Sequence, residues 1–304
     1  MRRGFGLPQG GRAAGPDAVA RVARRAEELG YDSLWVFDRF LFPVAPQTPY
    51  LATPDGAYPE AFKGVLDPLD TLLWAAAHTR TIKLGTSVLD MPFYNPVLLA
   101  RQLTTVDVLS GGRLRVGLGL GWSKDEFDAA GRSMKGLGKL ADEFIAVLLA
   151  IWTTDPSEFH GEVYELPRSV FRKPVQKPHP PLYLGAFSPG ALARTGRVAD
   201  GWNPVFLPVD AMRQMMETVR GAAREAGRDP GEIELVVRAN VNETAQPLGS
   251  DRPVFHGSRD QIAADLAATR ELGAAEIFVD PSFSRAGESV DGFLSTLESM
   301  RELI

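Results

Sequence analysis

The sequence contains no cysteine among its 304 residues. This absence excludes disulfide frameworks, zinc sites built on thiolates, thiol nucleophiles and iron–sulfur clusters. The sequence also has no excess of positive charge, because it contains 33 Lys and Arg residues against 38 Asp and Glu residues, which gives a net charge of −5. No overall basic field attracts nucleic acid, so we expect no nucleic-acid partner.

Long hydrophobic runs are missing as well. The longest strongly apolar segment, residues 144–152, is much shorter than the ~20 residues that a membrane-spanning helix needs. Arg2 and Arg3 faintly resemble a twin-arginine signal, but no apolar segment follows them. We therefore expect a cytoplasmic protein with no membrane partner.

Glycine and proline are the residues in excess, with 30 and 23 copies against ordinary shares of roughly 7% and 5%. Since 44% of the residues are hydrophobic, the chain can bury a large core, and its glycines and prolines must occupy particular turns. Two stretches hold twelve of the prolines: Pro43, Pro46, Pro49, Pro54, Pro59 and Pro68, then Pro156, Pro167, Pro174, Pro178, Pro180 and Pro181.

Hydrophobic periodicity alternates along the chain between that of a strand and that of a helix. Strands are expected at 3–8, 31–37, 82–88, 113–118, 181–185, 201–205, 233–239 and 276–279. Helices are expected at 16–29, 69–78, 95–110, 188–198, 210–226, 259–272 and 290–304, with an interrupted helical pattern over 125–152. Eight such units favour an α/β fold of the closed (β/α)8 TIM-barrel type over an open doubly wound sheet, in a single domain covering residues 1–304.

The two proline-rich stretches are insertions into this barrel, one after strand 2 and one before strand 5. The first leaves the carboxyl end of a strand, which is the functional face of a TIM barrel, so it is either a lid or a rigid surface loop. The aromatic residues Phe40, Phe42, Tyr50, Phe93 and Tyr94 are candidates for a pocket wall or for packing. The second insertion leaves the end of a helix, and we expect it to lie away from the site.

The carboxyl ends of the expected strands are poor in paired carboxylates and contain no histidine. This pattern argues against a Ser-His-Asp hydrolase and against a His-ligated metal site, so no metal is expected. The four histidines lie elsewhere, at His78, His160, His179 and His256.

Two glycine-containing segments follow expected strands. Residues 117–122, Gly-Leu-Gly-Leu-Gly-Trp, let a flat ligand or another backbone come close, and tight packing explains these glycines equally well. Residues 183–190 end a strand and begin a helix at Ser188, where free N–H groups favour a phosphate or an ordinary helix start. Arg194, one turn along, would add a positive charge there.

Several segments, taken in order, resemble the bacterial luciferase-like monooxygenase superfamily, and within it the group of oxidoreductases that depend on the deazaflavin coenzyme F420. The matching segments are 30–38, 82–88, 95–96, 109–113, 117–122, 173–178, 180–181 and 199–202.

The resemblance implies a barrel that holds the coenzyme ring at its mouth, with a non-proline cis peptide between Ser87 and Val88. It places the site residues in four groups. Behind the ring and at its polar edge it places Thr86, Ser87, Val88 and Asp38. Beside the ring and its tail it places Gly119, Gly121 and Trp122. Around the phosphate it places Ala186, Phe187, Ser188 and Gly190. At the far side it places Gly201 and Trp202, whereas Trp35 on strand 2 is expected in the core.

One position departs from the pattern of this group. Many F420-dependent relatives have Asp-His after strand 2, and the His is proposed to transfer a proton, whereas this chain has Asp38 and Arg39. Arginine stays protonated and is a poor general acid or base, but it can fix an anionic group. The catalytic residues are therefore unknown, with Asp38 and Arg39 as candidates.

Three functions follow from the resemblance. The first is an oxidoreductase, acting as a reductase, that transfers hydride between F420 and a small organic substrate. The second is a monooxygenase that uses reduced FMN and dioxygen, and the third is a non-catalytic barrel protein that binds the coenzyme. Acidic chains with exposed barrel helices often form dimers, which leaves a homodimer open as the assembly.

Overall fold

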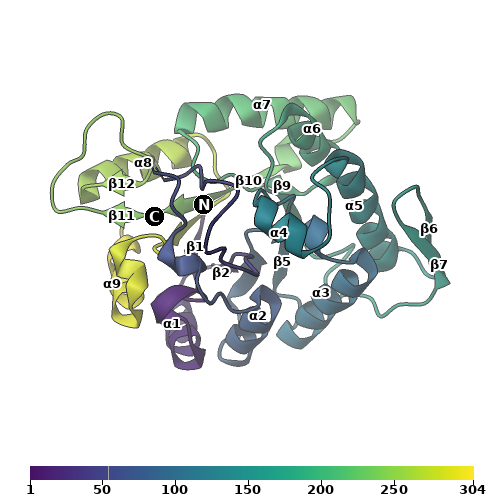
Figure 1. Cartoon of the computed structure of the whole chain (residues 1–304), viewed down its shortest axis with the longest axis horizontal. Coiled ribbons are helices and arrows are strands. Elements are labelled where there is room, and N and C mark those ends of the chain that lie inside the picture. The colour runs from purple at the N-terminus through teal and green to yellow at the C-terminus, as the bar shows by residue number, and fades with distance from the viewer. Residues whose placement is uncertain (54) are drawn as a thin grey trace.

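The computed structural model describes residues 1–53 and 55–304, so Pro54 of the first insertion lies outside the described residues. Parallel strands close into a barrel in the order β3, β2, β1, β13, β10, β9, β8 and β5, and β5 pairs back to β3 (Figure 1). The predicted TIM barrel is confirmed. The barrel strands are β1 (Arg2–Gly6), β2 (Ser33–Val36), β3 (Lys83–Thr86), β5 (Leu114–Gly119), β8 (Leu182–Leu184), β9 (Gly201–Trp202), β10 (Glu234–Asn240) and β13 (Glu276–Asp280).

Helices follow these strands and surround the barrel (Figure 1). The expected pattern over 125–152 forms two helices, since Gly131 and Gly136 between them have φ of +63° and +73°, which no helix accommodates. The last helix ends at Met300, four residues before the expected end. The helices are α1 (Pro16–Glu28), α2 (Pro68–Ala77), α3 (Pro96–Ser110), α4 (Lys124–Ala129), α5 (Leu137–Thr153), α6 (Pro189–Val198), α7 (Val209–Glu225), α8 (Arg259–Glu271) and α9 (Val290–Met300).

The sixth barrel strand is shorter than expected. Strand β9 stops at Trp202, and a single further bridge joins Val205 to Arg238. Pro204 lies between them and has no N–H to donate, so the hydrogen-bond ladder cannot run through it.

Short strands outside the barrel were not expected. The second insertion contains an antiparallel hairpin of β6 (Ser157–His160) and β7 (Glu165–Ser169), which lies beside α5 at the periphery (Figure 1), as expected for a segment away from the mouth. Strand β4 (Leu89–Asp90) pairs with the end of β5, and β11 (Asn242–Glu243) pairs with β12 (His256–Gly257).

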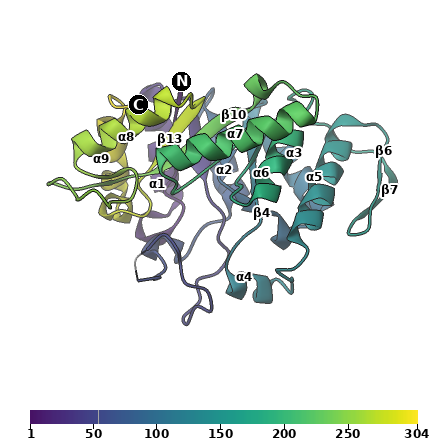
Figure 2. The same ribbon diagram turned by 90° about the horizontal axis from the view of Figure 1, so that it is seen from above.

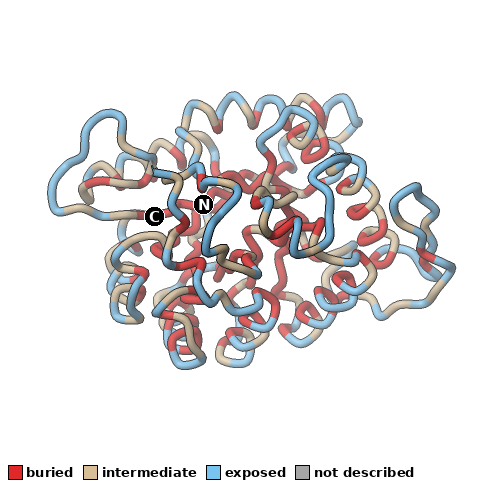
Figure 3. The backbone as a smooth tube through the Cα atoms, in the orientation of Figure 1, coloured by how far each residue is buried: buried red, intermediate tan, exposed pale blue. Residues whose placement is uncertain are grey.

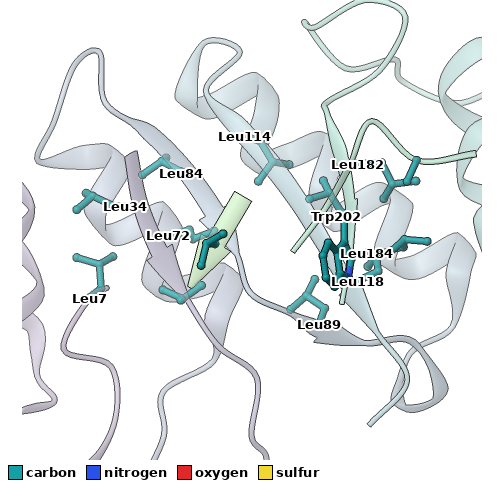
Figure 4. Close-up of a cluster of buried hydrophobic side chains, with 14 of the residues drawn as sticks. Leu7, Leu34, Leu72, Leu84, Leu89, Leu114, Leu118, Leu182, Leu184 and Trp202 are labelled. Atoms are coloured by element: carbon teal, nitrogen blue, oxygen red, sulfur yellow. The ribbon is translucent and has the colours of Figure 1, made fainter. Parts of the chain in front are cut away.

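The main core lies between the strands and the surrounding helices, where the buried residues gather (Figure 3). Leucines from neighbouring strands belong to this core, and Figure 4 labels Leu118, Leu182 and Leu184 beside Trp202. Among the described residues, no helix is both long and apolar enough to cross a membrane.

A buried charged network fills the amino-terminal end of the barrel. Glu276, which is fully buried, pairs with Arg2 and Arg115 and accepts a hydrogen bond of 2.8 Å from the indole Nε1 of Trp35. Trp35 stacks on Phe278 at 4.7 Å, so its expected place in the core is confirmed. Any open site must therefore lie at the other end of the barrel.

Candidate active site

The carboxyl ends of the strands meet under the insertion that follows β2. Figure 2 shows this loop and α4 projecting from one end of the barrel, while both termini lie at the other. Four aromatic residues of the β2 end and the insertion form a buried cluster, and Phe42, Trp122 and Phe283 pack against it. The buried members are Phe37, Tyr50, Tyr58 and Phe62.

Trp122 at the end of β5 is the contact point between the barrel and the insertion. Its ring lies 5.3 Å from those of both Tyr50 and Tyr58. The candidate Phe93 instead packs on Phe127 of α4 at 5.0 Å and on Phe40 at 5.1 Å. The insertion is thus a packed cover over the mouth, and its role as a lid stays a prediction.

Arg39 lies inside this cover with only 6% of its surface exposed. Its guanidinium stacks 4.7 Å from the Trp122 ring and 5.3 Å from the Phe62 ring. It also forms ion pairs, at 2.8 Å with Glu126 of α4 and at 3.6 Å with Asp90. Arg39 therefore joins the insertion to two carboxylates of the barrel mouth.

The carboxyl groups beside Arg39 are held by hydrogen bonds of ordinary length. The Oδ2 atom of Asp38 accepts bonds from the Tyr94 hydroxyl at 2.9 Å and from the Asp90 N–H at 3.2 Å. The Oδ1 atom of Asp90 accepts a bond of 2.8 Å from the Gly121 N–H. Glu126 accepts a bond of 3.2 Å from the N–H of Phe40.

Burial perturbs the acidity of all three groups. Desolvation raises the pKa of Asp38, partly offset by its hydrogen bond from Tyr94. Burial, together with the nearby charge of Asp38, raises the pKa of Asp90 to about 7. Burial also raises the pKa of Glu126 to about 7, against the opposing effect of Arg39. Asp90 and Glu126 therefore exchange protons near neutral pH.

This cluster corrects our sequence-based statement that the strand ends are poor in paired carboxylates. Asp38, Asp90, Glu126 and Asp280 follow different strands and are far apart in sequence, yet three of them lie around Arg39. Closure of the barrel brings the strand ends together, which spacing along the chain does not reveal. The signal available was one acidic residue shortly after each of several expected strands.

The peptide bond between Ser87 and Val88 is cis, as the resemblance implied. Side chains from later strands hold it in place. The Ser87 hydroxyl donates a bond of 2.7 Å to Asn203, and the Ser87 carbonyl accepts one of 2.9 Å from Arg238. Arg238 in turn pairs with Asp280 at 2.6 Å. Sequence reasoning missed Asn203, Arg238 and Asp280.

The glycines of β5 fit closely against the segment that contains this peptide. A Cβ atom on Gly117 would collide with the carbonyl oxygen of Thr86, and one on Gly119 would collide with Val88 and lie 2.9 Å from Oδ1 of Asp90. Thr86 is fully buried and exchanges hydrogen bonds of 2.9 Å with the backbone of Gly117. Tight packing thus accounts for Gly117 and Gly119.

The segment before α6 is open at its surface. Ser188 caps the helix by accepting a bond of 3.4 Å from the Ala191 N–H, and Phe187, Ser188 and Gly190 are exposed. A Cβ atom on Gly190 would meet nothing within 4 Å. The first turn therefore has room for a phosphate, with the Gly190 N–H left as a donor to it, since Pro189 has no N–H and those of Ala191 and Leu192 bond to Ser188. Ala186 is buried.

The residues predicted to lie beside the segment before α6 make contacts within the protein. Arg194 is buried and its guanidinium pairs with Asp142 of α5 at 2.7 Å, so its charge is already engaged. Trp202 is fully buried in the core, where its Nε1 donates a bond of 2.9 Å to the Ala186 carbonyl. Gly201 packs against the Tyr183 ring. A contact of Gly201 or Trp202 with a coenzyme stays a prediction.

The barrel and its covered mouth define a TIM-barrel protein, and sequence comparison identifies the family. The model of the luciferase-like monooxygenase family matches residues 3–246, and the chain belongs to this family. An uncharacterized protein of Mycobacterium tuberculosis is 32% identical over 267 residues, 85% of this chain and 93% of the relative. An F420-dependent glucose-6-phosphate dehydrogenase of Kineococcus radiotolerans is 31% identical over 250 residues, 78% of this chain and 68% of the relative.

Solved structures share the fold at lower identity. The monooxygenase RslO1 from Streptomyces bottropensis superposes with a TM-score of 0.79 at 21% identity, covering 100% of this chain and 98% of that one. A coenzyme F420-dependent tetrahydromethanopterin reductase from Methanopyrus kandleri gives 0.76 at 18%, covering 98% and 97%. A type II Baeyer-Villiger monooxygenase from Pseudomonas putida, in complex with FMN, gives 0.76 at 17%, covering 100% and 98%.

Proposed function

We propose that this protein is an oxidoreductase that transfers hydride between coenzyme F420 and a small organic substrate, acting as a reductase. The observation that carries this proposal is the likeness to F420-dependent glucose-6-phosphate dehydrogenase, which extends over 78% of the chain. Arg39 stands where many F420-dependent relatives have the proton-transferring His, so we propose a substrate other than a sugar phosphate.

The residues at the mouth fit such a coenzyme. We propose that its phosphate binds at the open first turn of α6, where Ala186, Phe187, Ser188 and Gly190 lie. The ring would then lie against Ser87 and Val88, with Asp38 at its polar edge. Thr86, Gly119, Gly121 and Trp122 would border it, and Gly201 and Trp202 would support it from within the barrel. When bound, the coenzyme supplies the hydride.

The chain itself positions the reactants and excludes water. The aromatic insertion covers the mouth, and a cover of this kind lowers the local dielectric and strengthens each charge interaction beneath it. Phe42, Tyr50 and Tyr58 would offer apolar surface to a small organic substrate. Arg39 holds Glu126 and Asp90 in place behind Trp122.

A second candidate function keeps the fold and exchanges the coenzyme. Structures that share this barrel include an FMN complex of a monooxygenase, which supports a reaction of reduced FMN with dioxygen. A deazaflavin has carbon where flavin has the N5 nitrogen and reacts poorly with dioxygen, so the two coenzymes imply different reactions.

Titration of the purified protein with oxidised F420 and, separately, with FMN tests the proposal. Binding is followed by coenzyme fluorescence, and tighter binding of F420 is expected. Tighter binding of FMN would favour the monooxygenase. Tight binding of F420 without turnover of any donor or acceptor would favour a non-catalytic coenzyme-binding protein.

A further inference from the structure

Two carboxyl groups at the barrel mouth pair with one guanidinium, and a third carboxyl group lies beside them. Asp38 follows β2, Asp90 ends β4 and Glu126 belongs to α4. They are linked through the bond from the Asp90 N–H to Asp38 and through the ion pairs of Arg39 with Asp90 and Glu126. We call these four residues the carboxyl cluster.

The carboxyl cluster is almost closed to solvent at its centre. The side chains of Arg39, Asp90 and Glu126 are 4%, 9% and 1% exposed. Arg39 can balance only one of the two buried carboxylates, Asp90 and Glu126, and the half-buried Asp38 adds a third negative charge beside them. Buried charges that lack a partner are strongly disfavoured. The carboxyl cluster therefore retains a proton at neutral pH, in agreement with the pKa of about 7 for both Asp90 and Glu126.

The carboxyl cluster lies directly behind the part of the mouth that the proposed function assigns to the coenzyme. Asp90 accepts the hydrogen bond of the Gly121 N–H, and its Oδ1 is 2.9 Å from where a Cβ on Gly119 would lie. Arg39 stacks on Trp122. The stored proton is thus held on the reverse side of residues 119–122.

We propose that Asp38, Asp90 and Glu126, held around Arg39, store and supply the proton that accompanies hydride transfer at this mouth. This inference rests on the proposed function. When hydride adds to one carbon of an acceptor C=C or C=N bond, the electron pair of that bond moves to the other atom, which takes up the proton. The carboxyl cluster then regains a proton from water. Arg39 is a positioning residue, because a guanidinium does not exchange its proton at neutral pH.

Other ionisable groups act on the carboxyl cluster from the elements packed around it. Tyr94 donates a hydrogen bond to Asp38, and Asp67 at the start of α2 adds negative charge near both. Tyr50 and Tyr58 of the insertion face Arg39, and burial raises the pKa of each above its ordinary value. The tyrosines are therefore protonated near neutral pH, and Asp90 and Glu126 are the groups that titrate there.

Infrared difference spectroscopy of the coenzyme-free protein tests the inference directly. As the pH is raised, the infrared band of a protonated carboxyl group is expected to disappear, with a midpoint between about pH 6 and about pH 8. The band is expected to weaken in Glu126→Gln and in Asp90→Asn, two variants that test the same cluster from different elements. It should be unchanged in Asp128→Asn, which removes an exposed carboxylate from the same helix α4. A protein with no carboxyl band that titrates above about pH 6 would overturn the inference.

Turnover provides the second measurement. With the coenzyme bound, Glu126→Gln is expected to lower kcat on the order of 100-fold and to change the pH profile of kcat, as loss of a proton donor does. Asp128→Asn should leave kcat and its pH profile unchanged. An unchanged pH profile of kcat in Glu126→Gln and Asp90→Asn would overturn the inference. The proposed function would still stand if the coenzyme binds. Failure of F420 and FMN to bind would instead overturn the proposed function, whatever the infrared spectra show, and with it the use of the stored proton.

Discussion

Arg238 donates a hydrogen bond of 2.9 Å to the carbonyl oxygen of Ser87 and pairs with Asp280 at 2.6 Å. One side chain on β10 thus connects the Ser87–Val88 peptide to the end of β13. Its guanidinium also lies 5.2 Å from the rings of both Phe37 and Phe283. Arg238 is only 7% exposed. It is therefore a buried cation whose several contacts connect the ends of different strands.

Replacement of this cation is expected to destabilise the fold. Arg238→Met keeps the apolar stem but leaves Asp280 buried without its partner, which costs about 3–5 kcal/mol of unfolding free energy. Urea denaturation measures the change. The matched control is Arg220→Met, which breaks a surface ion pair with Glu217 and should cost less than about 1 kcal/mol. Equal losses in the two variants would contradict this role of Arg238.

A second prediction concerns the first turn of α6. Ser188→Asp keeps a good N-cap residue but places a negative charge where we propose the phosphate, so coenzyme affinity should fall about tenfold while stability changes little. Fluorescence titration with the coenzyme gives the affinity. Ser289→Asp at the N-terminus of α9, another Ser N-cap, is the control and should leave affinity unchanged. Unaltered binding in Ser188→Asp would remove this turn from the site.

The glycines of β5 allow a packing prediction. Gly117→Ala would drive a methyl group into the Thr86 carbonyl oxygen and should destabilise the barrel by about 1–3 kcal/mol. Gly190→Ala places the same methyl group in open space at the start of α6 and should be neutral or slightly stabilising. Thermal unfolding of the two variants distinguishes a packing constraint from a general intolerance of substitution.

Stability should also depend on pH through the carboxyl cluster. The pKa values of Asp90 and Glu126 rise on folding from 3.8 and 4.5 to about 7. The folded state then binds more protons than the unfolded state, so these groups lower the unfolding free energy as pH rises through this window. Each contributes a slope of at most ~1.4 kcal/mol per pH unit. The contribution of these two groups to the unfolding free energy is complete at a pH below their unfolded-state pKa values of 3.8 and 4.5, and it is lost above about pH 7.

Urea denaturation across this pH range checks the sign. Relative to the wild type, Glu126→Gln should gain stability as pH rises, because it lacks the titrating group. In Asp128→Asn the difference from the wild type should stay flat, since Asp128 has a lowered pKa and titrates below this window. A flat difference for Glu126→Gln would show that folding does not raise the pKa of Glu126.

The sequence by itself determined the order of the elements and the closure of the barrel. Alternating strand and helix periods predicted all eight barrel strands, and Gly30, Gly227 and Gly273 marked helix ends that the structure confirms at positive φ. The ordered motifs indicated the family, and the resemblance to that family implied the cis peptide at Ser87–Val88. The order of the strands and helices and the positions of the helix ends depend on local backbone preference and on patterns within short segments. Both can be read from the sequence.

The tertiary structure alone decided which charges meet. The positions of Asp90 and Glu126 after separate strands did not show that both would pair with Arg39, and the expected charge of Arg194 near the α6 start proved to be engaged by Asp142. Strand ends that are neighbours in the closed barrel are separated by tens to hundreds of residues in the chain, as with Ser87 and Arg238. Burial then sets the pKa values of the carboxyl cluster, because desolvation depends on every element packed around a group and on no single segment.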